Sequence, residues 1–115
     1  MNNRERGKRG ERDARDAVRE YLGVRGAYRA AQSSGSLSAD LGGTGDIHFE
    51  VKLRKSLAVY EFIEQALRDC KNKVPAVLMR RDRDEWLLMV RLKDAMRFMG
   101  ALNDLQAEEQ PDSGT

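Results

Sequence analysis

The stretch DLGGTGDIHFEVK, residues 40–52, decides the fold that this sequence predicts. It is typical of a β-hairpin that turns at Thr44-Gly45. Side chains point alternately to the two faces of a strand, so His48, Glu50 and Lys52 should share one face. The other face is apolar and should point into a core; it consists of Ile47, Phe49, Val51 and Leu53. A carboxylate can hold a divalent cation and a lysine can steady a phosphate, so the polar face indicates a metal-dependent phosphodiesterase.

Two residues, Asp40 and Asp46, are candidates for a second carboxylate that could share a metal ion with Glu50. Hard cations such as Mg²⁺ take oxygen ligands, and two carboxylates that share one ion need Cα atoms within roughly 10 Å of each other. Asp46 lies four residues before Glu50 on one strand, which is roughly 13 Å away. A turn at Thr44-Gly45, or one around Gly45, instead places Asp40 opposite Phe49 or Glu50. We therefore favour Asp40, while a one-residue slip in register keeps Asp46 open as the ligand.

An acidic residue on the helix before this hairpin is a third candidate. The apolar pattern predicts a helix from Gly7 or Gly10 to Leu22, ended by Gly23. Glu11 falls on the apolar face of this helix, which is unusual for a carboxylate unless it has a function. The alternative is that Glu11 lies near the helix start, exposed, and favours the helix dipole.

The remaining patterns predict an α/β fold with a mixed central β-sheet of about five strands flanked by helices. They place strands over 25–31, 74–79 and 86–92 and helices over 57–72 and 93–105, with Ser56 as an N-cap and Met96 and Met99 facing inward. Residues 1–106 should form one domain that starts with a loose basic arm, 1–9. Residues 107–115 should form a disordered acidic tail.

Composition and charge limit the kinds of molecule that the protein is expected to bind. The chain of 115 residues is 40% hydrophobic and 35% charged, with a net charge of +2. All 21 Lys and Arg residues precede residue 100, whereas four of the 19 acids follow it. A positive folded part suits a polyanion, although many surfaces of this charge bind none. No apolar run approaches roughly 18 residues, so we expect no membrane partner. The single cysteine, Cys70, excludes an internal disulfide and fits a reducing, cytoplasmic compartment.

The order of these acidic motifs resembles the PD-(D/E)XK nuclease superfamily. An Asp on one strand, Glu-x-Lys on the next and a Glu on a preceding helix form its pattern. The layout is similar to that of the archaeal-type Holliday junction resolvases and their small phage-encoded relatives, over roughly residues 7–98. The matching elements are Glu11, Ser34-Gly35-Ser36, Asp40-Leu41, Phe49-Glu50-Val51-Lys52, Glu64-Gln65, Arg80-Arg81 and Glu85-Trp86. One departure is Ala39, where the superfamily often has a proline.

This resemblance implies a restriction-endonuclease-like core and a structure-specific DNA endonuclease, chiefly one that resolves four-way junctions. The cofactor implied is Mg²⁺, with Mn²⁺ as a substitute. Asp40 and Glu50 would hold the ion with the backbone carbonyl of Val51, and Glu11 would complete the site or position a metal-bound water. Lys52 would orient the nucleophile or stabilise the transition state. His48 shares their face, but a lone histidine without a second His or Cys does not make a zinc site.

The predicted DNA contacts surround this set: Lys8, Arg9, Arg12, Ser34, Ser36, Arg54, Lys55 and Gln65. The two serines read equally well as ordinary loop residues, and Gln65 as an exposed helix residue. A four-way junction has two symmetric scissile strands, so a homodimer is expected. Some of its interface residues would come from the set Leu87, Leu88, Met89, Phe98 and Met99. The protein would be nucleoid-associated, in a bacterial host if it is phage-encoded.

Three alternatives remain open at this stage. One is another nicking, repair or restriction-type endonuclease on the same fold. Another is a catalytically inactive DNA-binding module, against which stands the presence of all four acidic and basic site residues. The third is an RNA substrate in place of DNA.

Overall fold

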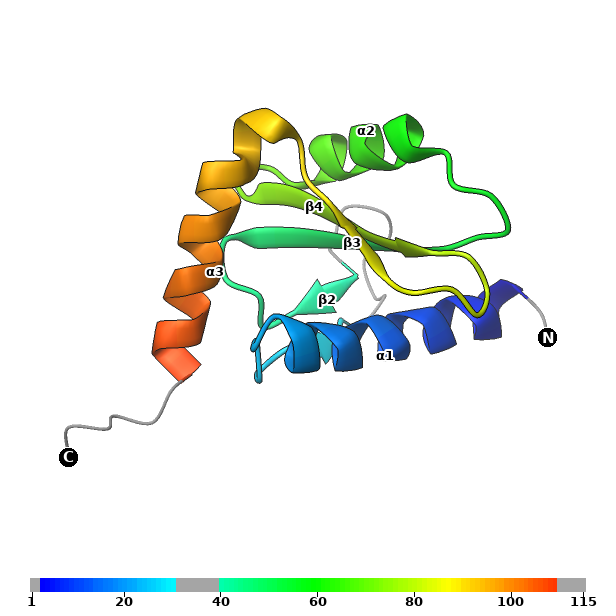
Figure 1. Ribbon diagram of the computed structural model, residues 1–115, viewed down its shortest axis with the longest axis horizontal. Helices are drawn as coiled ribbons and strands as arrows, with labels where there is room; N and C mark the ends of the chain where they lie inside the picture. Colours follow the sequence, from blue (N-terminus) through cyan, green and yellow to red (C-terminus); the bar gives the residue numbers. More distant parts are fainter. Residues whose placement is uncertain (1–2, 31–39, 110–115) are drawn as a thin grey trace.

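The computed structural model describes residues 3–30 and 40–109 (Figure 1). Its elements are α1 (Asn3–Tyr21), β1 (Tyr28–Arg29), β2 (Leu41–Gly42), β3 (Ile47–Leu53), α2 (Val59–Asp69), β4 (Val74–Arg80), β5 (Leu87–Met89), the 3₁₀ helix η2 (Leu92–Asp94) and α3 (Ala95–Glu109). Within the described residues, no helix combines the length and the apolar composition that crossing a bilayer requires.

The strands form two small sheets. β3 and β4 are parallel, with Glu50 opposite Val77, and β5 is antiparallel to β4 in the order β3-β4-β5. β1 and β2 form a separate antiparallel pair. The predicted α/β class is confirmed, but the expected single sheet of five strands is wrong. The predicted hairpin is wrong as a strand pair, because β2 pairs with β1 and not with β3. Asp40, which precedes β2, donates its N–H to the carbonyl oxygen of Phe49 in β3.

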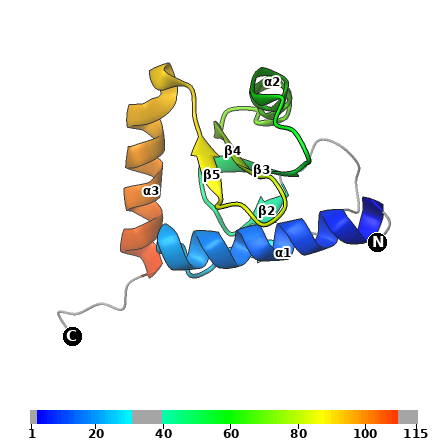
Figure 2. The same ribbon diagram turned by 45° about the vertical axis from the view of Figure 1, so that its right-hand side comes forward.

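Helices cover both faces of the three-stranded sheet (Figures 1 and 2). On one face α1 and α3 enclose a core that includes Val18, Phe49, Leu78 and Phe98, and the rings of Phe49 and Phe98 meet edge to face at 6.3 Å. On the other face α2 packs its apolar stripe onto the sheet; this second core is formed by Phe62, Ile63, Ala66, Val77 and Met79. Both faces of β3 and β4 are therefore covered, as expected for adjacent parallel strands.

α1 is longer than predicted at its start. Residues 3–9 are helical and not a loose arm, because Arg, Lys and Glu are good helix formers and continue the helix through Gly7. Gly10 is buried against β3, where an added Cβ would lie 3.3 Å from Cβ of Leu53. The predicted end is correct: α1 stops at Tyr21, and Gly23 follows with a φ of +69°.

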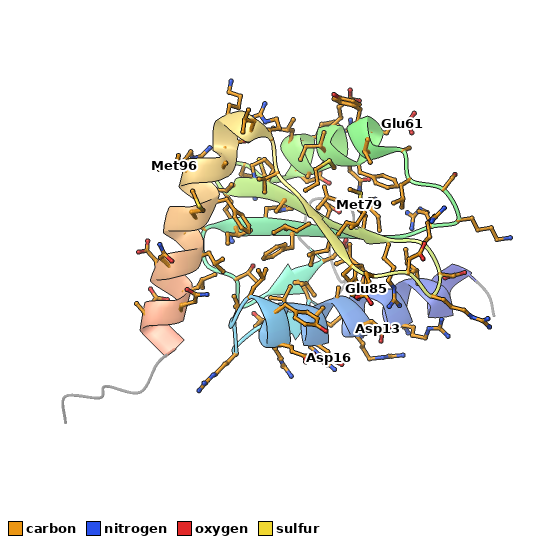
Figure 3. All side chains as sticks on the ribbon, in the orientation of Figure 1. Asp13, Asp16, Glu61, Met79, Glu85 and Met96 are labelled. Carbon is orange, nitrogen blue, oxygen red and sulfur yellow. The ribbon has the colours of Figure 1, made fainter. Side chains whose placement is uncertain are left out.

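Other boundaries differ by a few residues. α2 has Ala58 and not Ser56 at its N-cap, and β5 is only three residues long. α3 continues to Glu109, so the start of the expected disordered tail is helical. Met96, labelled in Figure 3, is 77% exposed and Met99 is 49% exposed, although their spacing predicted inward positions. A helix stripe predicted from spacing alone can be rotated when only part of it meets the sheet.

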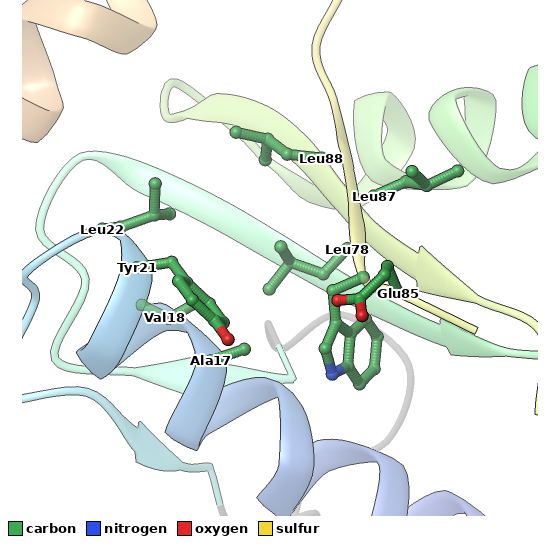
Figure 4. A pocket seen from close by; sticks show the side chains of 9 residues that line it. Ala17, Val18, Tyr21, Leu22, Leu78, Glu85, Leu87 and Leu88 are labelled. Carbon is green, nitrogen blue, oxygen red and sulfur yellow. The ribbon is translucent and has the colours of Figure 1, made fainter. Parts of the chain in front are cut away.

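An apolar pocket of about 250 Å³ lies between α1 and β5. In Figure 4, Val18 and Tyr21 of α1 lie on one side and Leu87 and Leu88 of β5 on the other. The acidic residues of the hairpin do not line it. Its lining has the chemistry of an apolar contact surface, and Glu85 is its charged member.

Candidate active site

Asp40 precedes β2 and faces the outer edge of β3. Its N–H donates to the carbonyl oxygen of Phe49 at 3.1 Å, and its carboxylate Oδ2 accepts a hydrogen bond of 2.7 Å from the N–H of Val51. These two bonds bracket Glu50 and hold the Asp40 carboxyl group beside it. The register agrees with the predicted turn, which put Asp40 opposite Phe49 or Glu50.

Asp46 lies at the opposite end of β3, in the turn. It is exposed, and its backbone carbonyl accepts a hydrogen bond of 2.7 Å from the N–H of Val74. Of the two candidate ligands, the structure thus brings Asp40 and not Asp46 next to Glu50.

Glu50 is buried on the α2 side of the sheet. Its side chain is 3% exposed, and its Oε1 lies 2.8 Å from Nε2 of His48, which is also buried. Burial is the main cause of a raised pKa at both Asp40 and Glu11, and the negative charge of Glu50 raises both pKa values further. The three predicted carboxyl groups therefore lie close enough to interact, although they come from three separate segments.

Glu11 reaches this group from α1. The close approach of α1 to β3 at Gly10 sets its position, and its side chain is 13% exposed. The guanidinium Nη1 of Arg29, on β1, lies 3.4 Å from its Oε1. Burial raises the pKa of Glu11, and Arg29 opposes that rise. Glu11 is therefore turned inward, as its place on the apolar stripe suggested.

The electrostatics of Asp40 fit a cation site. Burial, then the charge of Glu50, raises the pKa of Asp40 to about 7, against the hydrogen bond from the N–H of Val51. Carboxyl groups that raise one another's pKa favour a shared proton or a shared cation. Carboxylate oxygen is the donor that Mg²⁺ prefers. The residues present thus fit a divalent ion.

The protein supplies only part of a coordination shell. Among residues 3–30 and 40–109, no three His, Cys, Asp or Glu side chains are arranged to hold a metal ion. Mg²⁺ needs fewer, because it usually keeps several waters and binds one or two carboxylates plus substrate phosphate. The carbonyl of Val51 can add a ligand. The N–H and C=O of one strand residue point to the same edge, and the N–H of Val51 points to Asp40.

Lys52 completes the polar face of β3. Its Nζ donates a hydrogen bond of 2.6 Å to Oε1 of Gln65 on α2 and lies 5.7 Å from the ring centre of Phe62. The side chain is buried, so its rotamer is fixed by α2. Gln65, predicted as a DNA contact, here bonds the lysine.

Five of the other predicted contacts lie on α1 or directly after β3. Arg9, Arg12, Arg54 and Lys55 are exposed, and Lys8 is partly buried. Because Gly10 packs on Leu53, the first half of α1 and the segment after β3 lie side by side. Ser34 and Ser36 lie outside the described residues.

Two partners of the acidic residues were not predicted from the sequence. Arg29 pairs with Glu11, and His48 bonds Glu50. The alternation of β3 already put His48 on the face of Glu50, which was the available signal. Nothing in the sequence marks Arg29 among nine basic residues in the first 29 positions, because its pairing depends on where β1 docks.

A small α/β core in which Glu-x-Lys on a strand meets an Asp from the preceding segment defines a nuclease of the PD-(D/E)XK superfamily. The model of one family, described as "Phage putative PDDEXK endonuclease", matches residues 2–109, and the chain belongs to this family. The predicted superfamily is thereby confirmed, and its members generally use divalent metals. Neither the curated proteins nor the solved structures gave a significant match.

Proposed function

We propose that the protein is a Mg²⁺-dependent, structure-specific DNA endonuclease that resolves four-way junctions by paired nicks. The observation that carries the metal-dependent chemistry is the meeting of Asp40, Glu50 and Glu11, with Lys52 two residues after Glu50 on the same face of β3. A general anion-binding surface would not bury three carboxyl groups together, because their mutual repulsion costs stability unless a cation joins them.

Each residue has a distinct task in this proposal. Asp40 and Glu50 hold the ion with the carbonyl of Val51, and Glu11 holds or orients a water molecule. A bound Mg²⁺ supplies a more acidic water and neutralises charge on the scissile phosphate. Lys52, fixed by Gln65, donates to the phosphate as negative charge develops on it.

The path of DNA is proposed from the basic residues beside the site. Gly10 of α1, which lies between Arg9 and Arg12 in the sequence, packs on Leu53, and Arg54 and Lys55 follow directly after Leu53. Lys55 also lines a groove of about 570 Å³ between the end of β3 and the turn after β4, together with Ser56, Leu57, Arg80, Arg81, Asp84, Glu85 and Leu87. Such groups contact phosphates and read backbone shape more than base sequence.

A second copy would give one site for each scissile strand. We propose that the copies meet at β5, the edge of the three-stranded sheet, where Leu87 and Leu88 are 50% and 42% exposed. Met99 is exposed as well. Phe98, which we expected at this interface, lies in the core and cannot contribute. Sedimentation equilibrium tests this: Leu88→Glu should give a monomer, whereas Met96→Glu on α3 should not. A wild-type monomer contradicts the proposal.

The deciding experiment is cleavage of a labelled immobile four-way junction beside a linear duplex of the same sequence. We expect symmetric nicks near the branch point with Mg²⁺ and none with EDTA. Equal cutting of the linear duplex would favour a nicking, repair or restriction-type endonuclease on the same fold. Metal-dependent cutting of RNA alone would reassign the substrate, and junction binding without cleavage would favour an inactive DNA-binding module.

The ligand assignment has a matched pair of variants. Asp40→Asn should lower turnover by about two orders of magnitude or more while leaving junction binding nearly intact. Asp46→Asn, on the exposed turn, should cleave nearly as the wild type does. An inactive Asp46→Asn beside an active Asp40→Asn would transfer the role to Asp46.

A further inference from the structure

His48 is the hydrogen-bond partner of Glu50 within β3. The two side chains lie on one face of the strand, with Nε2 of His48 2.8 Å from Oε1 of Glu50. They are 4% and 3% exposed. A hydrogen bond buried to this degree is stronger than one at the surface, because little water competes for either group.

Lys52 lies on the same face of β3 but has a different hydrogen-bond partner. Lys52 directs its Nζ to Oε1 of Gln65 at 2.6 Å, on the far element α2. Glu50 is thus held from within β3, and Lys52 is held from α2. The carboxylate and the ammonium group are kept in position by different partners, so each can be perturbed separately.

The bond engages one of the two carboxylate oxygens of Glu50. As a ligand to a cation Glu50 would be an ionised carboxylate, which only accepts hydrogen bonds, so Nε2 of His48 would carry the hydrogen. The direction of Oε1 is thereby fixed, and with it the orientation of the carboxylate that would meet a cation shared with Asp40. A carboxylate fixed in advance loses less rotamer freedom when an ion binds than a free one does.

We propose that His48 is a positioning residue for the metal site, which holds Oε1 of Glu50 and so orients this carboxylate toward the ion. This inference rests on the proposed function, because it concerns the ion that Glu50 is proposed to hold. His48 contacts neither the ion nor DNA in this assignment; it acts through Glu50.

The test is calorimetric titration of Mn²⁺ into the full-length, DNA-free protein. His48→Leu fills most of the ring volume without a donor, whereas His48→Gln carries an amide N–H at a similar reach. Loss of a partner behind a metal ligand weakens metal binding about 10- to 100-fold, so we expect such a loss for His48→Leu and about threefold or less for His48→Gln. Junction cleavage by His48→Leu should recover as Mg²⁺ is raised, because the ligand itself remains.

Glu50→Ala separates failure of this inference from failure of the proposed function. If Glu50→Ala binds Mn²⁺ as the wild type does, Glu50 is not a ligand and both fall. If Glu50→Ala weakens binding but His48→Leu does not, only the role of His48 is overturned. In the Glu50→Ala background His48→Leu should have no further effect, and an equal loss in both backgrounds marks His48 as merely structural.

If His48→Leu folds poorly, which urea unfolding would reveal, a variant with a shorter polar side chain gives a second test. His48→Asn keeps a polar amide but does not reach Oε1. It should bind Mn²⁺ about 10-fold or more weakly than His48→Gln. Equal binding by His48→Asn and His48→Gln overturns the proposal.

Discussion

At the scale of single residues, ionisation of the Asp40 carboxyl group links the pH to the stability of the folded protein. Burial, reinforced by the charge of Glu50, raises its pKa from an ordinary 3.8 to about 7. Between these two values the folded protein holds a proton that the unfolded chain has released. The stabilising contribution is therefore complete below about pH 4 and is lost as pH rises through about 7.

We predict that Asp40→Asn stabilises the metal-free protein at pH 8. The amide cannot ionise, and its oxygen can still accept the hydrogen bond from the N–H of Val51. The gain should be roughly 2–4 kcal/mol at pH 8 and close to zero at pH 4, since each pKa unit is worth about 1.4 kcal/mol. Thermal unfolding in EDTA at both pH values measures it. A variant that loses stability equally at both pH values would show that ionisation of the buried Asp40 carboxyl group is not what destabilises the protein at pH 8.

We also predict that Gln65 acts on turnover more than on DNA affinity. Its Oε1 accepts the hydrogen bond of 2.6 Å from Nζ of Lys52, so Gln65→Ala frees a buried ammonium group to change its rotamer. Junction cleavage by Gln65→Ala should fall roughly 10-fold or more, with affinity within about threefold of the wild type. Glu64→Ala, at the exposed neighbouring position of α2, is the control. Weakened binding with unchanged turnover would restore Gln65 as a direct DNA contact.

At the scale of elements, the turn between β2 and β3 sets the position of Asp40. Thr44 closes it: its Oγ1 donates to the carbonyl oxygen of Ile47 at 2.9 Å, and its own carbonyl accepts from the N–H of Ile47 at 3.0 Å. Gly43 has a φ of +72°, and an added Cβ there would lie 2.3 Å from the carbonyl oxygen of Gly26. Backbone conformation and packing both exclude a side chain at this position.

Gly43→Ala should therefore lower the free energy of unfolding by about 2–4 kcal/mol, through strain at positive φ and displacement of the Gly26 backbone. Gly100→Ala on α3 is the matched control, since nothing lies within 4 Å of an added Cβ there. That change should stabilise the protein by roughly 0.5–1 kcal/mol, because alanine is the better helix former. Urea unfolding measures both. A small loss in the free energy of unfolding for Gly43→Ala would show that this turn rearranges at little cost in stability.

These elements show why sequence could predict some features and not others. The alternation in β3 and the turn before it are local, so the placement of Glu50, Lys52 and Asp40 could be predicted, although the turn is centred on Gly45-Asp46 and not on Thr44-Gly45. The pairing of β2 with β1 could not, because strands of two residues carry too little pattern to reveal a partner. The exposure of Met96 depends on which part of α3 meets the sheet, and periodicity does not report that.

At the scale of the whole molecule, positive charge gathers at one end of the site. α1 brings its basic first half to the end of β3, where Arg54 and Lys55 follow (Figure 1). The sequence showed the basic excess but not its place, because that depends on the burial of Gly10 against Leu53. η2, with Lys93, lies at the opposite end of the sheet.

A basic surface of this kind should reveal itself in the salt dependence of junction binding. Each phosphate contact releases condensed counterions, so the double variant Arg54→Ala/Lys55→Ala should reduce the slope of log affinity against log salt by about 1 to 2. Lys93→Ala should leave the slope unchanged. Fluorescence anisotropy with Asp40→Asn as the common background avoids cleavage during the measurement. An unchanged slope in the double variant, with a reduced one in Lys93→Ala, would move the DNA path to the other end of the sheet and away from the carboxyl groups.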